Sequence, residues 1–133
     1  MNNFEERFSR QAGMIPTDKL LATKAAVIGV GAIGRQVALQ LAALGVQQLV
    51  LLDFDEVDFS NVASQGYFWE DAQLKRPKVK ATRQLIRRID PHIETEIIVD
   101  RYRPKLEVGD VVFCCVDSSS TRATMWGSLQ HQV

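Results

Sequence analysis

The chain has 133 residues, of which 46% are apolar and 24% charged, so it is long enough to fold as one domain with a buried core. Sixteen Lys and Arg residues balance sixteen Asp and Glu residues, which argues against a general nucleic-acid binder or a protein that binds anionic membranes. No apolar run reaches the roughly 20 residues of a membrane span, and the N-terminus is too charged for a signal peptide, so we expect a cytoplasmic protein.

The first part of the chain predicts two short helices, over residues 4–11 and 17–23, because a glycine and a proline separate two helix-forming stretches. The apolar pattern then changes at residue 24. We therefore interpret residues 1–23 as an N-terminal helical arm and residues 24–133 as one α/β domain.

A strand–helix–strand unit opens this domain. Residues 24–30 form a short apolar run that ends in glycines, which predicts a buried strand. Apolar residues at helical spacing predict a helix over 32–44, and residues 47–55 are the next buried strand. Units of this length are parallel and right-handed in nearly all cases.

The rest of the chain continues the alternation of helices and strands. Residues 54–76 have no sustained period, and because long loops in compact domains are usually functional or disordered, we interpret this one as functional. A helix is predicted over 77–89, strands over 92–99 and 110–117, and a final helix over 120–132. This order predicts a Rossmann-like α/β fold with a doubly wound, mainly parallel sheet of strand order 3-2-1-4.

Two cysteines, Cys114 and Cys115, are adjacent in the last predicted strand. Strand neighbours point to opposite faces and cannot easily form a disulfide with each other. We expect both to be reduced and buried, and the sequence has no cysteine pairs of the CxxC kind that bind zinc.

A glycine-rich turn carries the clearest chemical signal. Gly29, Gly31 and Gly34 form GxGxxG directly after a predicted strand and at the start of a predicted helix, and Asp53 ends the next strand. The glycines permit a tight turn, the helix N-terminus favours phosphate, and the carboxylate accepts hydrogen bonds from a ribose. The pattern predicts a nucleotide site without deciding between NAD and ATP, and a turn used only for packing is the alternative.

Charged residues at three further places are candidates for the site. Lys78 lies in the first turn of a predicted helix, where a cation opposes the helix dipole, which indicates a bound anion or else a solvated basic face. Arg7 and Arg10 share a helix face and either reach a phosphate on a neighbour or face water. Asp117 ends the fourth strand, where it would hold Mg²⁺ on ATP phosphates or cap the following helix.

The long segment 54–76 adds two neutral candidates. Asn61 and Gln65 can give hydrogen bonds to a nucleotide or a carboxylate. Polar loop residues that only face water are the alternative.

Five sequence blocks, in this order along the chain, resemble the ThiF/MoeB family of adenylyltransferases, which are relatives of the ubiquitin-activating enzymes. The blocks are RFSRQ (7–11), GVGAIG (29–34), LLDFDEVDFSN (51–61), RPK (76–78) and CCVDSSSTR (114–122). Such enzymes bind Mg-ATP on the glycine turn. They transfer AMP to the C-terminal carboxylate of a ubiquitin-like or sulfur-carrier protein and release pyrophosphate.

The resemblance implies the cofactor-binding residues. Asp53 would hold the ribose and Asn61 would contact phosphate, and we place Asp55 and Gln65 from the same segment in the cofactor site with them. The domain over 24–133 would then be a nucleotide-binding domain with ATP and Mg²⁺ as its cofactors.

The resemblance also implies the catalytic residues. Lys78 would contact phosphate, and Asp117 would engage the metal or the phosphates. Arg10 would be supplied to the ATP of a neighbouring subunit, so we expect a homodimer whose further partner is a ubiquitin-like or sulfur-carrier protein.

The chain departs from the family at three places. Ser64 stands where the pattern SNxxRQ has an arginine that contacts phosphate, and Lys75 replaces the usual glycine before the x-P-K stretch, which as a hypothesis restores a cation nearby. We also expect the C-terminal half of the family fold to be missing, with the zinc-binding CxxC pairs of many members and the cysteine that forms a thioester.

Two other interpretations stay open at this point. An NAD-dependent oxidoreductase fragment would use the glycine turn and Asp53 equally well. A non-catalytic module that keeps the nucleotide fold for dimerisation would be compatible with Ser64.

Overall fold

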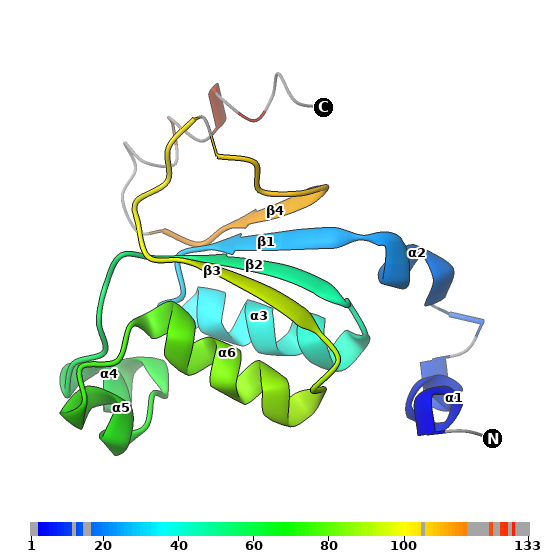
Figure 1. Cartoon of the computed structure of the whole chain (residues 1–133), viewed down its shortest axis with the longest axis horizontal. Coiled ribbons are helices and arrows are strands. Elements are labelled where there is room, and N and C mark those ends of the chain that lie inside the picture. Colours follow the sequence, from blue (N-terminus) through cyan, green and yellow to red (C-terminus); the bar gives the residue numbers. More distant parts are fainter. Residues whose placement is uncertain are drawn as a thin grey trace.

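The fold is a parallel β-sheet with its main helices packed on one face (Figure 1). The computed structural model describes residues 3–11, 13–14, 17–104 and 106–116, together with residues 123, 126, 127 and 129. Within these residues, the strands are β1 (Lys24–Ile28), β2 (Gln48–Leu52), β3 (Glu94–Ile98) and β4 (Val111–Cys114). They are all parallel and lie in the order β3-β2-β1-β4, which confirms the predicted fold class and strand order. Most of the helix predicted over 120–132 lies outside the described residues.

The helices follow the predicted positions closely, with two additions. They are α1 (Asn3–Phe8) with the 3-10 turn η1 (Ser9–Gln11), α2 (Thr17–Ala22), α3 (Ala32–Leu44), α4 (Ser60–Gln65), α5 (Trp69–Gln73) and α6 (Lys78–Ile89). Helices α3 and α6 lie side by side on the same face of the sheet (Figure 1). No helix in the described ranges is long and apolar enough to cross a membrane.

The two central strands are buried on both faces. Residues 25–28 of β1 and 49–52 of β2 are at most 2% exposed. Val27 and Leu51 pack with α3 and α6, whereas Ala26 and Val50 pack with Tyr102 from the segment after β3. A strand covered on both faces needs a continuous apolar run, which is why these two strands are so clear in the sequence.

The segment 54–76 is the part of the prediction that needs correction, because it contains α4 and α5 and is not one irregular loop. These helices have six and five residues, too few for a 3.6-residue period to be recognised. Short helices need contacts from outside the helix. In α5 the Asp71 carboxylate accepts the Phe68 N–H at 3.1 Å and pairs with Arg76.

The N-terminal arm docks at the C-terminal end of α3. The Arg7 guanidinium donates to the Ala42 carbonyl at 2.6 Å and pairs with Asp90, which follows α6. Burial alone would raise the pKa of Asp90, but hydrogen bonds from His92, Gln47 and Arg7 lower it from 3.8 to about 2. The arm is therefore held by a carboxylate that stays charged at neutral pH.

The two cysteines are less buried than expected. Cys114 is exposed and Cys115 is half-buried, and neither forms a disulfide. Within the described residues β4 is the outer strand of the sheet and pairs only with β1, so fewer neighbouring side chains cover its faces. Burial, with a smaller effect of the neighbouring Cys114, raises the pKa of the Cys115 thiol, so this thiol is not activated.

Candidate nucleotide-binding site

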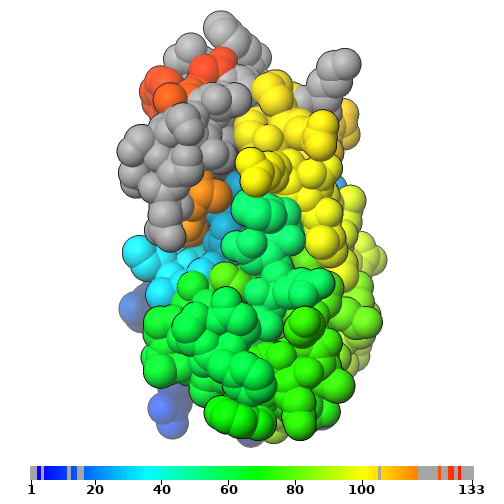
Figure 2. All heavy atoms as spheres, turned by 90° about the vertical axis from the view of Figure 1, so that its left-hand side faces the viewer, coloured from blue at the N-terminus to red at the C-terminus, as the bar shows by residue number. Residues whose placement is uncertain are grey.

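The carboxyl ends of the strands meet at one edge of the sheet, where ligands of open α/β folds bind. Figure 2 looks at this edge, with the start of α3 in cyan, the segment after β2 in green and the segment after β3 in yellow around it. The described candidates other than Arg10 come from the turn before α3, the segment after β2, α4 and the first turn of α6.

Two glycines of the turn are required by the packing of the chain on itself. Gly29 has a φ of +90°, and a Cβ there would lie 2.9 Å from the Cys115 carbonyl oxygen. A Cβ on Gly34 would lie 1.6 Å from the carbonyl oxygen of Gly29. Glycine at these two positions allows the start of α3 to approach the end of β1 closely, as the motif predicts.

Gly31 is different, because nothing in the described chain demands a glycine there. Its φ is −73°, and a Cβ would meet the nearest atom, Nε2 of Gln65, at an ordinary 3.5 Å. Gly31 is also the N-cap of α3, which has no side-chain cap and no acidic residue in its first turn. The first backbone N–H groups of α3 and the space above Gly31 therefore fit an anion that approaches the backbone closely.

Asp53 shapes the turn from the end of β2. Its Oδ2 accepts the N–H of Val30 at 2.9 Å, and its Oδ1 accepts the N–H of Asp55 at 2.8 Å. The side chain is half-exposed, and each carboxylate oxygen can accept a second hydrogen bond. Asp53 is thus placed beside the turn with capacity left for a ribose hydroxyl.

Lys78 is buried at the same edge, with a residue exposure of 7%. Its backbone N–H donates to the Asp55 carbonyl at 3.0 Å, and Val57 donates to the Arg76 carbonyl, so the start of α6 is tied to the segment after β2. The Nζ atom lies 3.9 Å from Oδ2 of Asp55, whose side chain is half-exposed. An ammonium with so distant a counter-charge is available to a phosphate at this edge.

Asn61 and Gln65 occupy α4. Asn61 is buried, and its Oδ1 accepts the N–H of Asp58 at 2.9 Å, which leaves its amide N–H groups without a partner among the described residues. Gln65 reaches over Gly31, and its buried Oε1 has no partner in the described part of the chain. Gln65 thus lies at the glycine turn with an unused acceptor, and Asn61 keeps unused N–H donors in the same short helix.

Arg10 is not brought to this site. It is exposed in η1, on the arm that docks at the C-terminal end of α3 (Figure 1). The glycine turn lies at the other end of this 13-residue helix, about 20 Å away along its axis. Arg10 cannot reach the nucleotide site of its own chain.

The predicted metal ligand Asp117 lies outside the described residues. Among the residues that are described, no group of three or more His, Cys, Asp or Glu side chains could hold a metal ion. Mg²⁺ on a nucleotide needs only one or two carboxylates besides the phosphates. Its binding through Asp117 therefore stays a prediction.

Comparison with known proteins assigns the chain to a family. Residues 5–126, which include most of the arm, the glycine turn and Lys78, match the ThiF family. The chain belongs to the ThiF family. Its fold is that of ThiF-type adenylyltransferases.

Two curated relatives show how much of a ThiF protein is present. The chain is 34% identical to the molybdopterin-synthase adenylyltransferase of Haemophilus influenzae, over 96% of the chain and 56% of that protein. It is 32% identical to the sulfur carrier protein ThiS adenylyltransferase of Escherichia coli, over 87% of the chain and 50% of that protein. The chain thus spans about half the length of these relatives.

Solved structures show the same ThiF fold. The E. coli tRNA N6-threonylcarbamoyladenosine dehydratase TcdA, solved in complex with ATP, superimposes with a TM-score of 0.87 at 21% identity. The match covers 99% of this chain and 58% of TcdA.

Two buried residues beside the glycine turn, Tyr67 and Arg35, belong to no motif quoted from the sequence. Tyr67 is buried, and its hydroxyl contacts Thr82 of α6. The same hydroxyl donates to the Val30 carbonyl and so holds the glycine turn in place. Burial raises the pKa of Tyr67 above its usual range, so it stays a donor. Arg35, in the first turn of α3, is also buried, and its guanidinium lies over the Tyr67 ring. In the sequence, Arg35 stands out only as a charged residue directly after GxGxxG, and this position does not show that it is buried.

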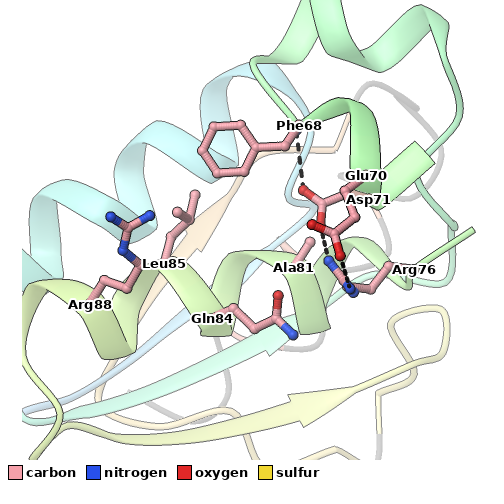
Figure 3. A pocket seen from close by; sticks show the side chains of 8 residues that line it. All are labelled: Phe68, Glu70, Asp71, Arg76, Ala81, Gln84, Leu85 and Arg88. Atoms are coloured by element: carbon pink, nitrogen blue, oxygen red, sulfur yellow. Dashed lines mark hydrogen bonds and ion pairs between the residues drawn. The ribbon is translucent and has the colours of Figure 1, made fainter. Parts of the chain in front are cut away.

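A separate small hollow lies between α5 and α6 (Figure 3). It has a volume of about 150 Å³, and the paired Asp71 and Arg76 lie at one end and Arg88 at the other. No glycine of the turn lines it, and neither does Lys78. The candidate nucleotide site is therefore the sheet edge and not this hollow.

Proposed function

We propose that this chain binds Mg-ATP at the carboxyl edge of its sheet and, as part of a ThiF-type adenylyltransferase, activates the C-terminal carboxylate of a ubiquitin-like or sulfur-carrier protein. The observation that carries the proposal is that Lys78 is buried at the same sheet edge as the glycine turn. In this turn the space above Gly31 is free of close contacts with the described residues. An NAD site would use the turn and Asp53 but would give Lys78 no role.

The described residues fit a nucleotide. The N-terminal amides of α3 and the space above Gly31 suit a phosphate, and Asp53 has capacity for ribose hydroxyls. Lys78 and the amide of Asn61 supply a positive charge and N–H donors for the phosphate chain. When bound, Mg-ATP supplies the adenylyl group and neutralises part of the phosphate charge.

The proposed reaction needs no protein nucleophile. A carboxylate oxygen of the carrier forms a bond to the α-phosphorus, the bond from that phosphorus to the bridging oxygen breaks, and pyrophosphate leaves with the electron pair. Transfers of this kind depend on positioning and on charge neutralisation. Lys78 and the α3 amides would stabilise the negative charge that develops on the leaving phosphates.

The place of Arg10 supports a homodimer. Because Arg10 lies at the far end of α3 from its own site, it can act on a nucleotide only in another subunit. We propose that it does so, as the resemblance implies, and that Asp117 holds Mg²⁺.

Exchange of labelled pyrophosphate into ATP tests the proposed activity. With the E. coli sulfur carrier ThiS as acceptor, or a ubiquitin-like protein in a second series, we expect exchange that depends on the carrier, because the adenylate forms reversibly from its carboxylate. The matched control is the same carrier with its terminal carboxylate converted to an amide, which removes the attacking oxygen. Binding of Mg-ATP without exchange in either series would contradict carrier activation and favour a non-catalytic nucleotide-binding module.

A further inference from the structure

Arg35 is a buried cation without a counter-charge in the described structure. It lies in the first turn of α3 and is 6% exposed. Among the described residues, its Nε has no hydrogen-bond partner and no carboxylate forms an ion pair with its guanidinium. Arginine keeps its charge in proteins, so it cannot escape this environment by losing a proton.

A charge in such an environment is unfavourable unless something pairs with it. The free energy needed to remove an ion from water exceeds what most single interactions in a protein contribute. Buried charges are therefore normally paired or bound to a ligand. The ring of Tyr67, whose centroid lies 5.3 Å from the guanidinium carbon, compensates only in part. The burial of Arg35 therefore indicates an anion that the described residues do not supply.

The guanidinium lies next to the nucleotide site. Side chains of a helix lean towards its N-terminus, which in α3 is the glycine turn. The terminal nitrogen Nη1 of Arg35 is 3.2 Å from where a Cβ of Gly66 would be, so it lies at the end of α4. The Tyr67 hydroxyl below it bonds to Val30 of the turn, and the unpartnered Oε1 of Gln65 lies beside Gly31. The unpartnered cation thus lies between the turn and α4.

We propose that Arg35 is a phosphate-binding residue of this site, which donates its guanidinium N–H groups to a phosphate of the nucleotide on the glycine turn. Ser64 lies in the last turn of α4, two residues before Gly66, and is exposed. Arg35 thus supplies, from α3, a guanidinium at the C-terminal end of α4. Ser64 stands at this end of α4 in place of the arginine of the family pattern. The inference rests on the proposed binding of Mg-ATP.

The variant Arg35→Met tests the inference, because methionine keeps the apolar stem against Tyr67 and removes the charge. We expect roughly 10- to 100-fold weaker binding of Mg-ATP in calorimetry, the usual effect of losing a charged hydrogen bond. Adenosine, titrated by NMR, should bind with unchanged affinity. Without ligand, the melting temperature should rise by about 2–5 °C, since an unpaired buried charge is gone.

Arg87→Met is the matched control, since Arg87 is exposed in the last turn of α6, at the other end of the fold. This variant should bind both Mg-ATP and adenosine with unchanged affinity. The double variant Arg35→Met/Ser64→Arg should recover Mg-ATP binding, because it supplies a guanidinium from α4.

Two results would overturn the inference, and a third would remove its basis. If Arg35→Met melted at a lower temperature or failed to fold, and bound adenosine and Mg-ATP equally more weakly, Arg35 would have a structural role. Unchanged Mg-ATP affinity in Arg35→Met would exclude a phosphate contact while leaving the proposed function intact. Absence of Mg-ATP binding in the unmodified chain would contradict the proposed function itself.

Discussion

Replacing Gly34 with Ala is expected to prevent stable folding. The new Cβ would lie 1.6 Å from the Gly29 carbonyl oxygen, and both groups are held by the backbone, so no side-chain rotation relieves the overlap. Gly29 cannot retreat easily, because it packs on the Cys115 carbonyl. We expect a loss of about 4 kcal/mol or more, a large part of the roughly 5–15 kcal/mol that stabilises a small domain. Thermal unfolding followed by circular dichroism measures it.

The matched control is Gly31→Ala in the same turn. Its Cβ would make an ordinary 3.5 Å contact, and its φ of −73° suits alanine, so the melting temperature should stay within about 2 °C. The methyl group would occupy the space proposed for phosphate, and Mg-ATP affinity should fall at least tenfold. A Gly34→Ala chain with the native melting temperature would contradict this account of the turn. Unchanged Mg-ATP binding by Gly31→Ala would show that phosphate does not approach there.

Replacing Lys78 with Met is expected to weaken Mg-ATP binding roughly 10- to 100-fold, with a larger loss, about 100- to 1,000-fold, in the rate of pyrophosphate exchange. The reason is that the ammonium is proposed to stabilise charge that grows as pyrophosphate leaves, so its contribution is greater in the transition state than in the bound state. Calorimetry and exchange kinetics on the same preparation separate the two effects.

Lys80→Met serves as the control, because Lys80 lies in the same helix turn and is exposed. This variant should change neither the affinity for Mg-ATP nor the rate of pyrophosphate exchange. The Lys78→Met chain should melt at or above the native temperature, since Nζ has one described partner, 3.9 Å away on the half-exposed side chain of Asp55. A clear drop in melting temperature without a change in Mg-ATP affinity would mean that Lys78 serves the fold and not the nucleotide.

The main elements of the fold were predictable because single local signals determine them. The strands β1 and β2 are continuous apolar runs, since both faces of each are covered, and α3 begins at a glycine motif. Helices α4 and α5 were missed because they are too short to show a period and are stabilised by contacts outside the helix, such as the pairing of Asp71 with Arg76. Cys114 is exposed on the outer strand of the sheet that the described residues form, and the apolar run alone does not reveal this position.

The candidate site could be predicted where residues follow a strand or begin a helix. The structure brings Asp53, Asn61, Gln65 and Lys78 to the edge that the glycine turn defines, although their roles stay predictions. The sequence did not indicate Arg35, because only the packing of α4 against α3 makes it buried and unpaired.

Calorimetric titration of the chain with Mg-ATP and, separately, with NAD would show whether the carboxyl edge of the sheet holds Mg-ATP. We expect saturable binding of Mg-ATP that Lys78→Met weakens and Lys80→Met does not, and no comparable binding of NAD. Tight binding of NAD that does not change in Lys78→Met would contradict the account and assign the glycine turn to a dinucleotide.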